Sequence, residues 1–298
     1  MRRSDIGVLE QQRQCRALNT MSFEDASLEQ DKMELLAIGT SAVVYTLNNA
    51  SVLKQYHSAN ESFQREKLIY ERLGQHDNIA RLFETTATGI VLERGECLRR
   101  VLQRREPCDH NSENLTWAIQ AAEGLFYMHS RNIVNADVGP HNLILIDSKQ
   151  IKCVDFEGSG IDDQLATASY DIHYWRPAKG SASIDTDIFA FGCLLFEIEQ
   201  GSPPYSDTFN HLPPHKQASQ IDSLYSKGQY PDVSGLFLGQ IISACWNRRF
   251  RDMAEVLMAL RRLSSRSPSG SGAESVWKRM VSMALSFGNV LRHVQRKR

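Results

Sequence analysis

The sequence predicts an α+β protein with two lobes: a small β-rich N-lobe that carries one helix, and a larger α-helical C-lobe. Short apolar runs separated by turn residues fill the first 93 residues, whereas apolar residues at helical spacing dominate from about residue 96 onward. The chain has 298 residues, 42% of them hydrophobic, which is enough to bury a sizeable core. A sheet followed by a helical body predicts a cleft between the two.

The N-lobe is predicted to span about residues 31–93. Gly39 and the pair Asn48-Asn49 are turn residues, so the runs on either side of them are expected to form antiparallel strands. A helix is expected over 62–73, where apolar residues recur at helical spacing before Gly74. The five strands are expected at 33–37, 43–47, 51–56, 80–83 and 90–92.

The C-lobe is predicted to span about residues 96–263. Its apolar residues follow the helical period except in one hairpin, where strands at 142–146 and 151–156 flank the turn Asp147-Ser148-Lys149. The four helices are expected at 98–103, 115–129, 186–200 and 241–263.

Both ends of the chain differ in composition from this central part. Residues 1–30 are polar without an apolar period and are expected to form a flexible leader, and the Ser/Gly-rich stretch 264–274 is expected to be a linker. Residues 275–298 predict a basic amphipathic helix, which suits contact with a membrane surface or a calmodulin-like partner. A helix docked on the C-lobe is the alternative.

Charge and cysteine content exclude several classes of function. Lys and Arg total 34 against 35 Asp and Glu, and a net charge of -1 argues against nucleic acid as a partner. The sequence contains no run of about 18 apolar residues, so it predicts no membrane span. None of the six cysteines is spaced as a zinc or redox motif, which favours an intracellular location, cytoplasmic or nuclear.

Four chemistry-bearing features follow one another in a specific order. A turn at Gly39 precedes a strand, and Lys54 lies on the next strand. Asp137 and Asn142 then occur in one loop as Asp-x4-Asn, and Asp155 follows in the hairpin sequence Val-Asp-Phe. From about residue 33 to 263 this order resembles the eukaryotic protein kinase family, and it looks like the divergent kinase-like proteins of filamentous fungi.

The resemblance implies a protein-kinase-like fold that binds ATP and Mg²⁺. It implies that Lys54 neutralises the α- and β-phosphates and that Glu66, on the N-lobe helix, holds Lys54. Asp137 would be the catalytic base that accepts or orients the substrate hydroxyl proton. Asn142 and Asp155 would be the Mg²⁺ ligands, since a hard cation favours amide and carboxylate oxygens.

The resemblance also assigns residues to the nucleotide. Val44 and Val52 would contact one face of the adenine and Ile144 the other, with Leu92 as gatekeeper. The hinge would run from Glu93 to Gly95. The phosphate loop would comprise Ala37, Ile38, Gly39, Thr40, Ser41, Ala42, Val43 and Val44, in which only one of the three family glycines is present.

A further match lies in the C-lobe. Residues 187–192 (Asp-Ile-Phe-Ala-Phe-Gly) match the family's central helix, whose Asp caps the backbone of the catalytic loop. Small-molecule kinases that share the Asp-x4-Asn loop lack this segment. A protein kinase is therefore favoured over a small-molecule kinase.

Five departures from the family pattern bear on activity. Asn135 and Ala136 replace a His and an Arg, so phosphorylation at Thr167, Ser169 or Tyr170 is not expected to be an on-switch. The other three departures are Gly139 for Lys, Glu157 for Gly and Ala178 for Glu. The substituted groups only assist phosphoryl transfer. The groups that the transfer itself requires are retained, namely those of Lys54, Glu66, Asp137, Asn142 and Asp155. The sequence therefore favours a slow protein kinase acting on Ser/Thr hydroxyls, and the alternative is a nucleotide-binding pseudokinase scaffold.

Overall fold

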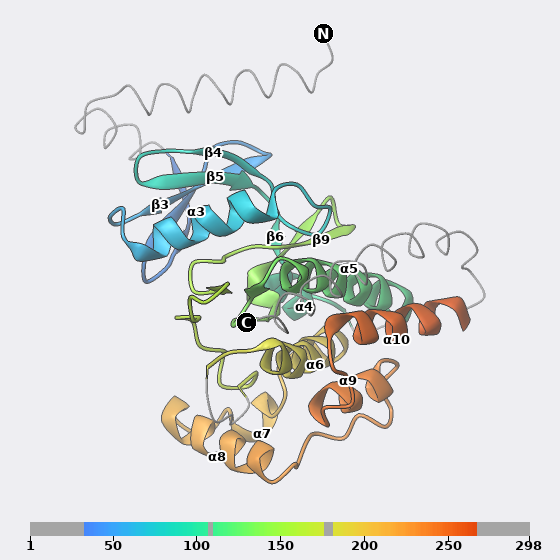
Figure 1. Ribbon diagram of the computed structural model, residues 1–298. Coiled ribbons are helices and arrows are strands. Elements are labelled where there is room, and N and C mark those ends of the chain that lie inside the picture. Colours follow the sequence, from blue (N-terminus) through green and yellow to red (C-terminus); the bar gives the residue numbers. More distant parts are fainter. Residues whose placement is uncertain (1–32, 107–109, 176–180, 267–298) are drawn as a thin grey trace, which may run out of the picture.

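The structure is a computed structural model that describes residues 33–106, 110–175 and 181–266, and it confirms the two-lobed α+β fold (Figure 1). The sheet and helix α3 form the upper lobe in that view, and the helices from α4 to α10 form the lower one. The predicted leader at 1–30 and the tail at 275–298, with its membrane or calmodulin contact, lie outside the described residues. No helix in the described part of the chain combines the length and apolar character that a membrane crossing requires.

The N-lobe is built on a five-stranded antiparallel sheet with the order β1-β2-β3-β5-β4. The fourth strand begins two residues later than predicted, because Ile79 pairs with Cys153 of the C-lobe and the Ala80 N–H donates to the Cys153 carbonyl. The strands are β1 (Glu34–Ile38), β2 (Ala42–Thr46), β3 (Ser51–Tyr56), β4 (Leu82–Thr85) and β5 (Gly89–Glu93).

Helix α3 (Glu61–Leu73) lies across one face of this sheet (Figure 1). The side chain of Asn60 accepts a hydrogen bond from the Phe63 N–H and begins the helix. Gly74, at φ 60°, ends it as predicted. The ring of Phe63 packs at 5.3 Å from that of Tyr56 on β3, which fixes the helix against the strand.

The C-lobe contains the predicted hairpin, β8 (Leu143–Ile146) and β9 (Gln150–Cys153), and β6 (Glu96–Cys97) joins its edge. A small pair of strands, β7 (Ile133–Val134) and β10 (Gly160–Ile161), was not predicted. The helices are α4 (Leu98–Gln103), α5 (Asn111–Ser130), α6 (Ile184–Gln200), α7 (Ser206–Phe209), α8 (Pro214–Ser226), α9 (Gly239–Trp246) and α10 (Met253–Arg266).

The predicted helix 241–263 is wrong as a single element. It consists of α9 and α10, and Arg248 at φ 54° adopts a left-handed conformation that no helix can continue through. Helix α10 extends through Arg266, past the expected domain end at 263.

Helix α6 forms the centre of the C-lobe core. It packs against α5 and α9, and α10 lies along α5 (Figure 1). Phe189 and Phe191 of α6 and Trp246 of α9 are completely or almost completely buried. These buried side chains hold α6 and α9 together at the centre of the lobe.

Candidate active site

Strand β3 carries Lys54 into the junction between the lobes. Four charged side chains meet there and are called the Lys54 cluster: Lys54, Glu66, Asp155 and Glu157. The Lys54 ammonium lies 2.8 Å from Glu66, 2.7 Å from Asp155 and 3.0 Å from Glu157. The cluster therefore joins the N-lobe sheet, helix α3 and the segment that follows β9.

Glu66 is the buried partner within this cluster. Its carboxylate accepts hydrogen bonds from the Lys54 ammonium, from the Tyr56 hydroxyl and, at 2.9 Å, from the backbone N–H of Phe156. Burial by itself lowers the pKa of Lys54, but the neighbouring carboxylates outweigh it and hold that pKa well above its ordinary value. Lys54 is therefore a permanent cation at neutral pH.

Glu157 links the cluster to the predicted phosphate loop. Its carboxylate accepts a hydrogen bond of 2.5 Å from the Ser41 hydroxyl, which lies between β1 and β2. From the sequence, Glu in place of the family's Gly is expected to limit backbone freedom and to add negative charge near the metal. In the structure it also fastens the loop of the N-lobe to the C-lobe.

The catalytic loop, residues 134–142, presents Asp137 at the same junction. The Asn142 side-chain amide donates to the Asp137 carboxylate at 2.8 Å and to its backbone carbonyl at 3.0 Å. The His141 Nε2 lies 3.2 Å from the other carboxylate oxygen of Asp137. The Val154 N–H donates to the Asn142 carbonyl, which places Asp155 beside the loop.

Asp187 of α6 holds this loop from below, and with its partners it is called the Asp187 anchor. Its fully buried carboxylate accepts hydrogen bonds from the backbone N–H groups of Asn135 and Ala136 at 2.8 and 2.9 Å. His129 Nε2 and the Tyr170 hydroxyl supply two more, at 2.8 and 2.6 Å. Ala136 takes φ 67°, a strained conformation for alanine that the anchor maintains.

The substitution of Asn135 for His leaves the packing above it continuous. The rings of Tyr70 and Phe156 are in direct contact, with centroids 4.9 Å apart. Asn135 turns its side-chain oxygen to the backbone N–H of Asp137 at 3.0 Å. The polar side chain therefore supports the loop instead of bridging the two rings.

The residues predicted to line the nucleotide are brought to the N-lobe sheet and its connection to the C-lobe. Val52 and Leu92 are paired across β3 and β5, and Ile144 lies on β8. Gly95 passes so close to β8 that an added Cβ would approach the Ile144 Cβ to 2.9 Å. Glu93 is engaged by Lys152 at 2.9 Å. In the predicted phosphate loop Ala37, Ile38, Gly39 and Thr40 are exposed, Ala42 is buried, and Ser41, Val43 and Val44 are partly buried.

The oxygen atoms at this junction fit a hard divalent cation. Carboxylate oxygens of Glu66, Asp155 and Glu157 lie within 4.8 Å of one another, but Glu66 is taken by the donors described above. Asp155 is the open member, with 44% of its side chain exposed. Because the Asn142 nitrogen donates to Asp137, its amide oxygen is the atom left for a cation. An all-oxygen set suits Mg²⁺.

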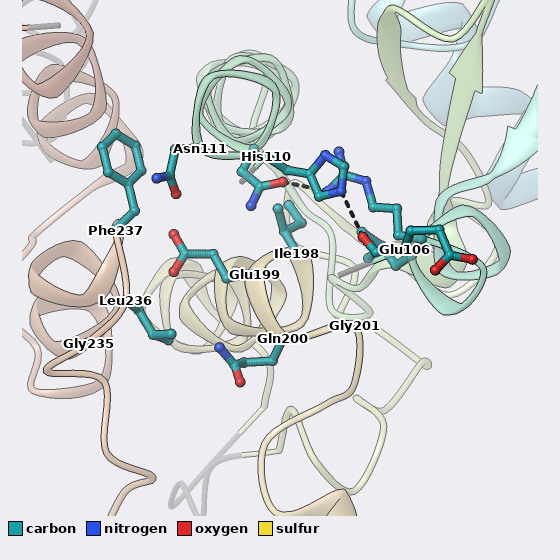
Figure 2. Close-up of a pocket in the computed structure, with 13 residues that line it drawn as sticks. Glu106, His110, Asn111, Ile198, Glu199, Gln200, Gly201, Gly235, Leu236 and Phe237 are labelled. Carbon is teal, nitrogen blue, oxygen red and sulfur yellow. Dashed lines mark hydrogen bonds between the residues drawn. The ribbon is translucent and has the colours of Figure 1, made fainter. Parts of the chain in front are cut away.

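A separate cavity of about 480 Å³ opens in the C-lobe, away from these residues (Figure 2). It lies between the start of α5, the end of α6 and residues 235–237. The Glu199 carboxylate at its wall accepts a hydrogen bond of 2.7 Å from the Leu238 N–H at the start of α9. The cavity contains none of the residues predicted to bind nucleotide.

Comparison with known proteins agrees with this arrangement. The family model of the protein kinase domain matches residues 37–262, more than half of the chain. The chain belongs to the protein kinase family. The kinase match thus covers β2 to β5, α3 and the C-lobe up to the last turns of α10.

Curated relatives include kinases of both main specificities. A probable serine/threonine-protein kinase of Clostridium acetobutylicum is 29% identical over 198 residues, covering 58% of this chain and 30% of that protein. CBL-interacting serine/threonine-protein kinase 14 of Arabidopsis thaliana is 30% identical over 57% of this chain and 41% of its own length. Tyrosine-protein kinase Shark of Drosophila melanogaster is 24% identical over 67% and 23%. The match spans less than half the length of each of these three relatives.

Sequence reasoning missed several contacts of this kinase domain. The two-residue period of a strand places Tyr56 and Lys54 on the same face of β3. The contact of Tyr56 with Glu66 could therefore have been predicted from the sequence. The contact of Ser41 with Glu157 joins residues 116 positions apart and had none. The positions of His141 and Tyr170 depend on loop conformations that no periodic pattern encodes.

Proposed function

We propose that this chain is an active protein kinase that transfers the γ-phosphate of ATP, bound with Mg²⁺, to serine or threonine hydroxyls of proteins. One observation carries the proposal. Lys54 lies between Glu66 and Asp155 at 2.8 and 2.7 Å, beside a catalytic loop in which Asn142 holds Asp137. The charged groups that phosphoryl transfer needs are thus assembled although several helper residues are substituted.

Each residue has a task that its surroundings support. Lys54, as a fixed cation, neutralises phosphate oxygens on the nucleotide, and Glu66 keeps it in place. Asp137 orients the acceptor hydroxyl and receives its proton. Asn142 and Asp155 hold Mg²⁺, which when bound supplies charge neutralisation for the phosphates. Most of the rate enhancement then comes from positioning and electrostatics, which the Asp187 anchor preserves by fixing the loop.

The preference for serine and threonine rests on the relatives. Relatives named as serine/threonine kinases are 27% to 30% identical to this chain, compared with 24% for each of two tyrosine kinases. The loop after Asp137 carries Gly139 and His141, so it has neither the Lys typical of serine/threonine kinases nor the Ala-Ala-Arg of tyrosine kinases.

We further propose an intracellular location. The four cysteines in the described part of the chain, Cys97, Cys153, Cys193 and Cys245, are free thiols. Burial raises the pKa of Cys153 and of Cys193 to about 12, so these thiols stay protonated and unreactive.

The test is label transfer from radioactive ATP with Mg²⁺ to a mixture of protein substrates, followed by phosphoamino-acid analysis. We expect phosphoserine and phosphothreonine with the wild-type chain, and a loss of at least a hundredfold with Asp137→Ala and with Lys54→Met. Equal labelling by all three proteins would overturn the proposal. Saturable ATP binding without transfer would identify a pseudokinase scaffold, and phosphotyrosine alone would overturn the serine/threonine assignment.

A further inference from the structure

Gly139 departs from the family pattern, His141 follows it by two residues, and the structure brings the two residues into contact. Gly139 has φ -177° and ψ 165°, an extended conformation that any residue adopts, so the backbone does not demand glycine here. Space does. A Cβ on residue 139 would lie 2.5 Å from Cε1 and 2.6 Å from Nδ1 of the His141 ring. The imidazole therefore occupies the volume in which a side chain at position 139 would begin.

The position of that ring places it against Asp137. Its Nε2 lies 3.2 Å from one carboxylate oxygen of Asp137, while Asn142 donates to the other at 2.8 Å. One oxygen of the proposed base therefore accepts a hydrogen bond from Asn142, and the other lies within ion-pair distance of the imidazole. Held at both oxygens, the carboxylate cannot rotate about its last bond without giving up a polar contact.

The remaining ring nitrogen gives a second indication. Nδ1 of His141 is buried and has no hydrogen-bond partner within the described residues. A buried polar atom without a partner is costly, and ligands commonly supply the missing contact at functional sites. Nδ1 belongs to the edge of the ring that faces position 139, where the resemblance places a lysine.

We infer that His141 is the positioning residue of Asp137 and takes over the place of the catalytic-loop lysine that Gly139 removes. This inference rests on the proposed kinase activity. The imidazole takes this role through its polar contact with Asp137 at 3.2 Å, which keeps the carboxylate turned toward the acceptor hydroxyl. Glycine at 139 is then a requirement of the histidine at 141, and the two residues form one unit.

The test is a steady-state comparison of Gly139→Ala, His141→Ala, the double variant and His141→Gln. His141→Ala should lower kcat about tenfold with the KM for ATP unchanged, because Asp137 loses orientation while nucleotide contacts stay. Gly139→Ala should have a similar effect, since its methyl group displaces the ring. The double variant should be no slower than either single variant, which is the signature of a coupled pair. His141→Gln should recover most of the activity because its amide N–H can reach Asp137.

Controls separate this inference from the proposed function. His215→Ala, at an exposed position on α8, should leave kcat unchanged. If the wild type transfers no more label than Asp137→Ala, the proposed function fails. If the wild type is active and His141→Ala matches it, or the two single effects multiply in the double variant, the positioning role is overturned.

The contact can also be checked without activity. In protein with ¹³C-labelled histidine, Asp137→Asn should shift the NMR signals of the His141 ring, which His141→Gln identifies by their disappearance. Unchanged signals would overturn the contact on which the inference depends.

Discussion

Two groups of residues hold the catalytic loop from opposite sides, and they differ in their exposure to solvent. Below it, the Asp187 anchor is closed to solvent, and all four donors around the carboxylate come from the protein itself. Above it, the Lys54 cluster and Asp137 are partly open, with 44% of the Asp155 side chain exposed. A buried carboxylate with four donors tolerates no substitution, whereas a half-exposed group can exchange partners. Four of the five departures from the family pattern lie in the loop or in the Lys54 cluster, and none changes Asp187.

The largest effect is expected from Asp187→Asn. The amide keeps one acceptor oxygen but turns an NH₂ group toward donors, so about two buried donors lose their acceptor. We expect the free energy of unfolding to fall by about 4 kcal/mol in urea titrations.

Asp185→Asn is the matched control, since it lies two residues earlier on α6. The Asp185 side chain is 44% exposed and pairs with Arg248, so its change should cost less than about 1 kcal/mol. Similar losses of unfolding free energy in the two variants would show that the Asp187 anchor stabilises the fold no more than an exposed ion pair does.

Lys54→Met should produce the next largest effect, and this effect should depend on pH. Burial raises the pKa of Glu66, and the Lys54 cation is what opposes that shift. Without the lysine, the folded pKa of Glu66 rises further above its unfolded value of about 4.3. A carboxyl whose pKa is higher in the folded than in the unfolded state contributes stability while it is protonated. This contribution is complete below the unfolded pKa and is lost as pH rises through the folded pKa.

The variant should therefore be close to the wild type near pH 4 and about 3 kcal/mol less stable at pH 7. Urea unfolding at a series of pH values measures this difference. Adding Glu66→Gln removes the carboxyl and should abolish the pH dependence. A deficit that is constant with pH in the single variant would contradict the explanation.

A smaller effect is expected from Glu157→Gly, measured as the Kd for ATP with Mg²⁺ by calorimetry. Glu157 adds a negative charge beside the place proposed for the phosphates, so its removal should tighten binding about fivefold, close to 1 kcal/mol. Glu157→Gln keeps the acceptor for Ser41 but removes the charge, and should tighten binding equally. Weaker binding in both variants would mean that Glu157 holds the loop in a binding shape.

The smallest effect is expected from Arg251→Ala. The family resemblance implies a buried pair between Arg251 and a Glu at position 178, which Ala178 cannot form, and position 178 lies outside the described residues. Arg251 instead pairs with Glu255, and 87% of its side chain is exposed. Its removal should leave the free energy of unfolding unchanged in urea titrations, because water screens an exposed ion pair. A measurable loss of stability would reveal a contact beyond this surface pair.

The sequence predicted the elements that carry strong periodic signals. The five strands of the N-lobe, helix α3 and the hairpin of β8 and β9 are present close to their expected positions. Helix α8 was missed because Ile221 and Tyr225 are its only buried side chains, too few to give a helical pattern. The break after α9 was missed because it depends on the left-handed conformation of Arg248 rather than on a Gly or Pro.

Motif order was sufficient to propose the residues of the candidate site, but not to predict their contacts. The sequence predicted that Lys54, Glu66 and Asp155 belong to one site, and in the structure Lys54 lies at ion-pair distance from both carboxylates. It gave no means of foreseeing that Glu157 reaches Ser41 or that the His141 ring fills the space beside Gly139. Such contacts depend on side-chain conformations in folded loops, which spacing along the chain does not determine.

The Tyr170 hydroxyl has a consequence for control of the protein by other enzymes. An enzyme that modifies a tyrosine needs the phenol oxygen presented to it, but here that oxygen points inward onto Asp187 and the residue is 6% exposed. The segment around Tyr170 would have to separate from α6 before a phosphate could be attached, and the added negative charge would then repel Asp187 and prevent its return. Phosphorylation of this tyrosine would therefore remove one hydrogen bond that supports the catalytic loop. It would lower the activity of the protein rather than raise it.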